Sequence, residues 1–239
     1  STVLLAIREG EPFDRLAYPV DGIIVGEPMR GDPVLRDLVE SGVPVVYGEG
    51  LLPGMPRPTG IVHSNHSAVF RRLLDELASE GTRRPVMLTP ADDSFWAHSL
   101  RDTYRGWCLD RDLPHDVIDI QLGHDPATVR DVVAGFLDSR DDTDAVVSSL
   151  DVGTSAVQHW ARQRGRAIGS DLLVVQCTDS LATTLSVPSI TSIDLRPDAL
   201  GSASAGLLLD ILWGNAEPGT DREHEVVIMH RDSSVRATR

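Results

Sequence analysis

The chain has 239 residues, and its 22 basic residues against 36 acidic ones give a formal net charge of −14. A surface this acidic repels phosphate, so these residues by themselves are poor candidates for holding DNA or an anionic membrane. All 22 basic residues are arginine, which excludes a Walker-type phosphate loop and Schiff-base chemistry because both need a lysine amine. The length allows one large or two small domains with a core of their own.

Two further features bear on where the protein works. The cysteines Cys108 and Cys177 form no CxxC motif and are too few for a disulfide scaffold, so we predict a reducing, cytoplasmic location. No apolar run is long enough to span a membrane, and the first residues lack the basic flank of a signal peptide. A strand-like run at 3–7 follows almost at once, which suggests that the chain begins partway through a fold.

Short apolar runs rich in Val and Ile alternate with helical patterns along most of the chain. Continuous apolar runs are typical of strands buried on both faces, and strand–helix alternation predicts parallel sheets covered by helices. Helices are predicted from 69 to 81, from 126 to 137 and from 152 to 165. The predicted strands lie at 20–25, 43–47, 85–89, 117–121, 145–149 and 172–177.

The rhythm changes after Thr191. Pro197 to Leu212 is predicted to form a helix with more apolar and small positions than one buried stripe needs, which fits either packing within the chain or a subunit contact. The acidic stretch 215–225 is predicted to be a surface loop, and 226–229 a final strand.

The motifs of common enzymes do not occur in their required context. The glycines at 48, 50 and 54 have the wrong spacing for a dinucleotide fingerprint and no helix follows them. A GxSxG nucleophile elbow is missing from 153–157. His63 and His66 have no third ligand at a fixed spacing and are interpreted as solvated loop residues. We therefore predict no enzyme activity, no catalytic residue, no cofactor and no metal.

Six segments, taken in order, resemble the ligand-sensing region of the lactose-repressor/galactose-repressor (LacI/GalR) family of bacterial transcription regulators. No single segment is specific, but their order across nearly the whole chain is. The resemblance makes the chain a candidate effector-binding region of a transcriptional repressor. The segments are VDGIIV at 20–25, GVPVV at 42–46, EGTRRPV at 80–86, DAVVSSLD at 144–151, VPSITSI at 187–193 and RDSS at 231–234.

The resemblance implies an α/β fold with two Rossmann-like lobes, parallel sheets and three crossovers, the periplasmic-binding-protein-like (type I) architecture. The N-terminal lobe is expected to contain 1–89 and 197–227, and the C-terminal lobe 90–194 and 228–239. A small molecule, a sugar or a related metabolite, would bind in the cleft. The family also pairs into homodimers and reads operator DNA through an N-terminal helix-turn-helix, which we expect upstream of Ser1.

Eight residues are predicted to contact the ligand, for three reasons. Some match ligand-site segments of the family, His124 falls where relatives place a stacking aromatic, and the rest surround the first crossover. The alternative is that Phe95 and Trp96 only pack at a hinge and that Arg101 is a surface charge. The eight are Asn65, Phe95, Trp96, Arg101, Thr103, His124, Asp151 and Asp179.

Three departures from the family pattern bear on the ligand. Thr103 stands where members carry an arginine, Thr178 precedes Asp179 where they carry an aspartate, and Leu150 replaces an asparagine. Either the ligand is less polar than usual or sensing is weakened. The other function that this resemblance allows is a solute-binding protein of a sugar transport system, which would need an export signal.

Overall fold

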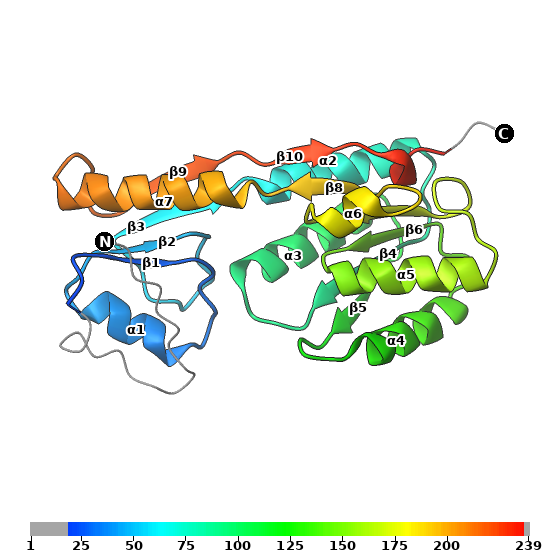
Figure 1. Ribbon diagram of the computed structural model, residues 1–239, viewed down its shortest axis with the longest axis horizontal. Coiled ribbons are helices and arrows are strands. Elements are labelled where there is room, and N and C mark those ends of the chain that lie inside the picture. The colour runs from blue at the N-terminus through cyan, green and yellow to red at the C-terminus, as the bar shows by residue number, and fades with distance from the viewer. Residues whose placement is uncertain (1–18, 237–239) are drawn as a thin grey trace. The chain divides into compact units, whose positions relative to one another are not determined.

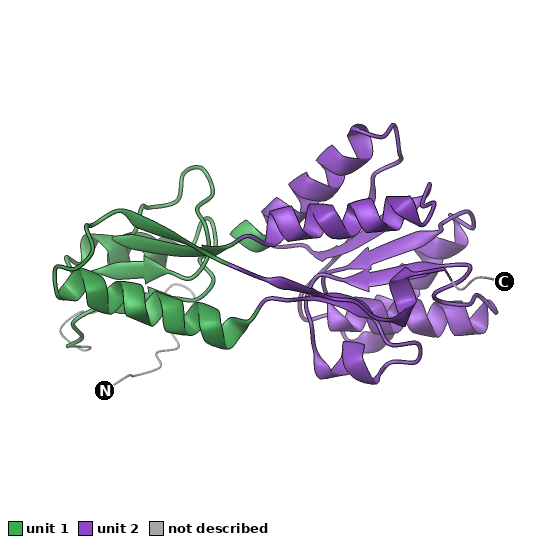
Figure 2. Ribbon diagram, turned by 90° about the horizontal axis from the view of Figure 1, so that it is seen from above, with its two compact units in different colours: residues 1–64, 93–96, 196–224 green, residues 65–92, 97–195, 225–239 purple. Residues whose placement is uncertain are grey.

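The computed structural model describes residues 19–236, which fall into two compact units (Figures 1 and 2). Unit 1 contains 19–64, 93–96 and 196–224, and unit 2 contains 65–92, 97–195 and 225–236. The strand-like run at 3–7 lies outside the described residues. Within 19–236, no helix is both long enough and apolar enough to cross a membrane.

Unit 1 is a parallel sheet with one helix on each face. Its strands are β1 (Ile23–Val25), β2 (Val45–Tyr47), β3 (Gly60–Ser64) and β9 (Thr220–His224), hydrogen-bonded in the order β1-β2-β3-β9. Successive side chains of β2 point to opposite faces, so Val45 and Tyr47 pack with α1 (Pro33–Glu40) while Val46 packs with α7 (Pro197–Leu212). A Cβ at Gly60 would lie 2.9 Å from Ile211 Cδ1, so this glycine permits the close approach of α7 to β3.

The strand β9 corrects the prediction of a surface loop over 215–225. Its five residues pair in parallel with the whole of β3, from Gly60 opposite Thr220 to Ser64 opposite His224. The sequence TDREH carries no apolar residue, so it lacks the hydrophobic pattern by which strands are predicted. An edge strand can form without that pattern, since most of its side chains remain in contact with water. Backbone hydrogen bonds to β3, and not a hydrophobic pattern, therefore make this segment a strand.

Unit 2 is built on a mixed sheet. The parallel strands confirm the predicted α/β class, and β10 alone runs antiparallel, against β8. The strands are β4 (Pro85–Pro90), β5 (Asp116–Ile120), β6 (Ala145–Ser148), β7 (Leu173–Gln176), β8 (Thr191–Asp194) and β10 (Val227–Met229), in the order β10-β8-β7-β6-β4-β5.

Helices cover both faces of this sheet. On one face, α4 (Pro126–Asp138) and α5 (Asp151–Gln163) lie side by side and pack on Leu88, Val146 and Val174 (Figure 1). On the other, α2 (His66–Ser79) contacts β8 and β10, and Trp107 of α3 (Phe95–Leu109) donates to Asp75 of α2 at 2.8 Å. The short helix α6 (Leu181–Leu185) and the 3-10 turn η1 (Asp232–Ser234) complete the unit.

The unit limits differ from the lobe limits inferred from sequence. The sequence places 65–89 in the first lobe, whereas the first segment of unit 1 ends at Ser64 and α2 belongs to unit 2. The physical reason is packing, because the buried face of α2 contacts elements of unit 2. At the second crossover, the unit boundary between Leu195 and Arg196 lies within the interval 194–197 expected from sequence. At the third crossover, the unit boundary lies between His224 and Glu225, three residues before the expected limit at 227–228.

Candidate functional site

In open α/β sheets, ligands bind beyond the carboxyl ends of the strands. At that edge of unit 2, the buried Gln176 ends β7 and links three neighbouring segments. Its Nε2 donates to Asp151 Oδ1 at 2.6 Å and to the carbonyl oxygen of Thr178 at 3.0 Å, while its Oε1 accepts from Thr154 Oγ1 at 2.5 Å. Gln176 was not among the predicted site residues, although it occupies the last position of an apolar strand, where a buried amide needs partners.

Asp151 is the first residue of α5, where a carboxylate is stabilised by the positive end of the helix dipole. Besides Gln176, Ser180 Oγ donates to Asp151 Oδ1 at 2.8 Å. Both hydrogen bonds therefore fall on one carboxylate oxygen, and no described residue donates to the other, Oδ2. Asp151 is exposed, so Oδ2 is a fixed acceptor open to solvent.

Asp179 has the same asymmetry. Thr183 Oγ1 at 2.8 Å, Ser192 Oγ at 2.6 Å and Arg231 Nη1 at 2.8 Å all donate to its Oδ1, and no donor to Oδ2 is found in the described part of the chain. Burial alone would raise the pKa of Asp179, but these hydrogen bonds and the charge of Arg231 outweigh it, so the pKa lies below its usual range. Asp179 is therefore held as the carboxylate.

Arg231 is the second contributor that sequence reasoning did not place in the site. Its side chain is 14% exposed, and Nη1 also donates to the carbonyl oxygen of Ile190 at 2.7 Å, while Nη2 donates to Thr184 Oγ1 at 3.1 Å. The guanidinium thus joins α6 to β8 and fixes Asp179 from the side. Arg231 belongs to the family-like RDSS segment, which could have indicated its importance, but its partner Asp179 lies 52 positions earlier in the chain.

Arg101, a predicted ligand contact, makes hydrogen bonds within unit 2. Its guanidinium donates to the carbonyl oxygens of Pro90 and Asp92 and to Asp119 Oδ1 at 2.9 Å. The side chain is 24% exposed, so it is not a free surface charge. Arg101 therefore connects the carboxyl end of β4 and the residues just after it to the carboxyl end of β5.

The remaining predicted residues of unit 2 are not joined to the Asp151–Asp179 network by a described hydrogen bond. Asn65 precedes α2 and accepts from the backbone N–H of Val226 at 3.0 Å, which connects two crossover segments. Thr103 is half-buried on α3, and His124 is exposed in the loop after β5.

Phe95 and Trp96 are half-buried and belong to unit 1. A Cβ at Gly50 would lie 2.5 Å from Phe95 Cζ, so the absence of a side chain at Gly50 lets the ring pack on the loop after β2. This contact supports the packing alternative for Phe95.

Unit 1 has its own acidic group at the carboxyl edge of its sheet. Glu49 follows β2, is 7% exposed, and accepts a hydrogen bond from Ser64 Oγ at 3.2 Å. Burial raises its pKa to about 7, although the Ser64 hydroxyl opposes the shift. Sequence reasoning did not select Glu49, because a glutamate between two glycines is equally typical of a solvated turn.

The histidines flanking this region correct the interpretation of solvated loop residues. His66 begins α2, is 1% exposed, and has its Nε2 2.5 Å from Ser99 Oγ. His63 lies within β3, with Nδ1 2.8 Å from Asp221 Oδ1. Among the described residues, no three His, Cys, Asp or Glu side chains are grouped so as to hold a metal ion.

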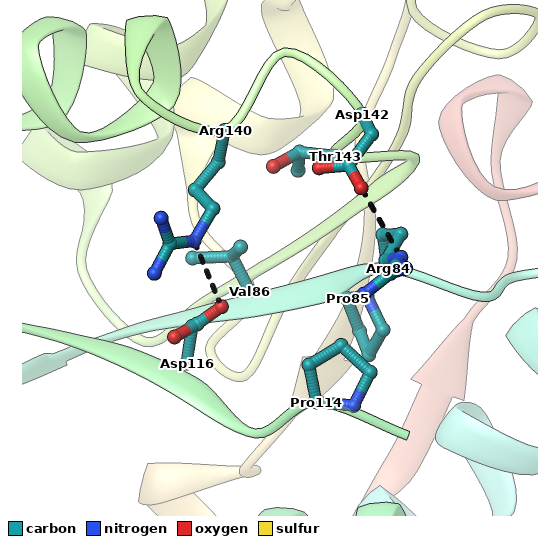
Figure 3. A pocket seen from close by; sticks show the side chains of 8 residues that line it. All are labelled: Arg84, Pro85, Val86, Pro114, Asp116, Arg140, Asp142 and Thr143. Atoms are coloured by element: carbon teal, nitrogen blue, oxygen red, sulfur yellow. Dashed lines mark hydrogen bonds and ion pairs between the residues drawn. The ribbon is translucent and has the colours of Figure 1, made fainter. Parts of the chain in front are cut away.

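A small pocket opens at the opposite, amino-terminal end of the unit 2 sheet (Figure 3). Its two guanidinium groups are already paired, Arg140 Nε with Asp116 Oδ2 at 3.4 Å and Arg84 Nε with Asp142 Oδ2 at 3.2 Å. We assign no ligand to it, because its charges are neutralised internally and it lies away from the strand ends that carry Asp151 and Asp179.

Comparison with known proteins identifies the family. Residues 74–234 match the periplasmic binding protein-like domain family. The chain is 27% identical over 239 residues to the HTH-type transcriptional regulator CelR of Thermobifida fusca, covering 97% of this chain and 70% of the relative.

Two solved structures share the fold. The transcriptional regulator CelR–cellobiose complex has a TM-score of 0.77 and 25% identity, covering 90% of this chain and 66% of that one. A regulatory protein of the LacI family from Chloroflexus aggregans has a TM-score of 0.78 at 21% identity, covering 91% of this chain and 78% of that one. The chain therefore belongs to the periplasmic binding protein-like domain family, as the effector-binding domain of a LacI/GalR-type regulator.

Proposed function

We propose that this chain senses a sugar for a bacterial transcription regulator and binds it at the carboxyl ends of β6 and β7. The observation that carries the proposal is the shared asymmetry of Asp151 and Asp179, each anchored through Oδ1 with Oδ2 left to accept. Fixed carboxylate oxygens suit sugar hydroxyls for two reasons. A hydrogen bond from a hydroxyl to a carboxylate is strong, and a carboxylate that is already held in place does not have to be ordered when the sugar binds.

A glucose disaccharide is the first ligand to test. A relative that is 25% identical is described as a complex with cellobiose, and a neutral polyol can donate to two carboxylates without bringing a further charge. Asn65, Phe95, Trp96, Thr103 and His124 remain proposed ligand contacts, whereas Arg101 would act indirectly by holding the ends of β4 and β5.

The test is calorimetry of this chain with cellobiose, lactose, maltose and glucose. Asp151→Asn and Asp179→Asn should each weaken binding of the best ligand by about 1–3 kcal/mol, the usual loss for a hydrogen bond to a charged group. Asp141→Asn is the matched control, because Asp141 is exposed and precedes the amino end of β6. If no sugar binds, or if both site variants bind as the wild type does, the proposal fails.

The proposed partners are a second copy of the chain and operator DNA. Exposed apolar side chains gather at the end of α7, where Leu209 is 43%, Leu212 38% and Trp213 69% exposed. We propose this surface as part of a homodimer contact, tested by the sedimentation of the wild type against Trp213→Glu. An unchanged dimer in the variant would place the contact elsewhere.

Operator DNA would be read by a part of the regulator outside these 239 residues, since the net charge of −14 opposes phosphate. Sequence-specific retention of operator DNA by this chain alone would contradict that assignment. Cys108 and Cys177 are buried free thiols, which suits the proposed cytoplasmic location. The domain would act as a sensor and not as an enzyme, with no cofactor.

A further inference from the structure

A second hollow lies between α4 and α5, on unit 2 alone. We call it the α4–α5 groove, defined by Arg130 of α4 and by Val152, Ser155, Ala156, His159 and Arg162 of α5. The α5 residues recur at three- and four-residue intervals, so they form one stripe along the helix. The stripe begins at Val152, one residue after Asp151, and includes neither Asp151 nor Asp179.

The cationic side chains of the groove have no acidic partner. Within 19–236, no carboxylate lies within ion-pair distance of Arg130, His159 or Arg162, and none of the three has another polar contact there. Within their own helices, no residue three or four positions away from any of them is acidic.

Several other arginines of unit 2 are paired with carboxylates, although Arg72 of α2 and Arg105 of α3 also have none within ion-pair distance among the described residues. Arg140 and Arg84 in the amino-end pocket are paired with Asp116 and Asp142 (Figure 3), and Arg164 of the same helical region is paired with Asp138 at 2.5 Å. In a protein with 36 acidic and 22 basic residues, internal counter-ions are abundant. The groove is therefore a local positive site on an acidic molecule.

We propose that the α4–α5 groove binds the phosphoryl group of a small phosphate monoester. A guanidinium donates through a planar fork that fits two phosphate oxygens, and two such forks with an imidazole supply donors for all three terminal oxygens. A ligand carboxylate has only two oxygens, so it would leave some donors of the two guanidinium groups and the imidazole without an acceptor. The Ser155 hydroxyl adds a neutral donor, while Val152 and Ala156 offer apolar surface to the organic part of the ester.

The experiment is a titration of the whole chain with phenyl phosphate and inorganic phosphate at low ionic strength, followed by 31P NMR and calorimetry. Saturable binding is expected, with phenyl phosphate tighter than inorganic phosphate. In the double variant Arg130→Gln/Arg162→Gln, affinity should fall at least about tenfold, because each charged hydrogen bond lost is worth that much. Both side chains are exposed, and circular dichroism checks that the variant folds.

Two controls separate a built site from general charge attraction. Arg72→Gln removes one exposed arginine from α2, outside the groove, and should leave affinity unchanged. Benzoate tests the preference for a phosphoryl group and should bind at least about tenfold more weakly than phenyl phosphate. The proposal is overturned if binding does not saturate, if Arg72→Gln weakens it as much as the double variant does, or if benzoate binds equally well.

Discussion

Unit 1 and unit 2 each place a carboxylate beside a serine hydroxyl at the carboxyl edge of a sheet, yet the two acids have opposite character. Glu49 in unit 1 accepts from Ser64, and its pKa is raised to about 7. Asp179 in unit 2 accepts from Ser192, and its pKa is lowered. Both are largely buried, at 7% exposure for the Glu49 residue and 23% for the Asp179 side chain.

Two differences separate them: Asp179 is less buried, and it accepts from Arg231 and Thr183 as well as from a serine. A hydroxyl donates one hydrogen bond and carries no charge, so it cannot offset the cost of burying a carboxylate, whereas a guanidinium in contact can. The same strand-end position therefore holds a permanent anion in unit 2 and a group that titrates near neutrality in unit 1. Four experiments test or refine this contrast.

The largest effect is expected from Arg231→Met, which leaves Asp179 half-buried without a counter-ion. The free energy of unfolding should fall by about 3 kcal/mol, since breaking a buried pair from one side strands the remaining charge. Urea unfolding at pH 7 measures it. Arg231→Lys keeps the positive charge but loses the planar guanidinium, so its free energy of unfolding should fall by less. If Arg231→Met lost under about 1 kcal/mol, the Arg231–Asp179 pair would behave like an exposed surface ion pair.

Glu49→Gln should change how stability depends on pH. A carboxyl whose folded pKa is raised binds its proton more tightly in the folded state, so it stabilises the fold at low pH and loses that contribution as pH rises towards the folded value. Between about pH 4 and pH 8, unfolding free energy should shift by about 2–3 kcal/mol in favour of the Gln variant over the wild type. Parallel pH–stability curves for the two proteins would show that Glu49 has an ordinary pKa.

Asp179→Asn should show the reverse dependence, on a smaller scale. A lowered pKa adds stability above the unfolded value of about 3.9, and that stability disappears as pH falls through the folded pKa. The wild type should therefore exceed the variant by about 1–2 kcal/mol at pH 7, and the gap should close in acid. Urea midpoints at pH 7 and near pH 2.5 give the comparison, and a gap that persists at the lower pH would contradict it.

The smallest effect is expected at the amino end of the unit 2 sheet. Arg84 and Asp142 form an ion pair with both side chains 55% exposed. Water screens such a pair, so Arg84→Gln should cost less than about 1 kcal/mol, and added salt should reduce the cost further. If Arg84→Gln lowered the free energy of unfolding as much as Arg231→Met does, burial could not explain why the two ion pairs differ in strength.

Much of the fold follows from local pattern. The apolar runs at 85–89, 145–149 and 172–177 became β4, β6 and β7, and Pro197 and Gly214 bracket α7 as helix-ending chemistry requires. These elements are predictable because their signals are held by neighbouring residues. The order of the six family-like segments also carried the family assignment.

Other features depend on partners that are distant in the chain. β9 forms because β3 offers a free edge to a polar segment 160 positions later, from Gly60 to Thr220. Asp179 is a permanent anion because Arg231, two residues after β10, donates to it, and Glu49 titrates near neutrality because the fold buries its carboxyl group. Residue types and local periodicity are written in the sequence, but the pKa of a carboxyl and the pairing of an edge strand are set by which groups the tertiary fold brings within hydrogen-bond distance.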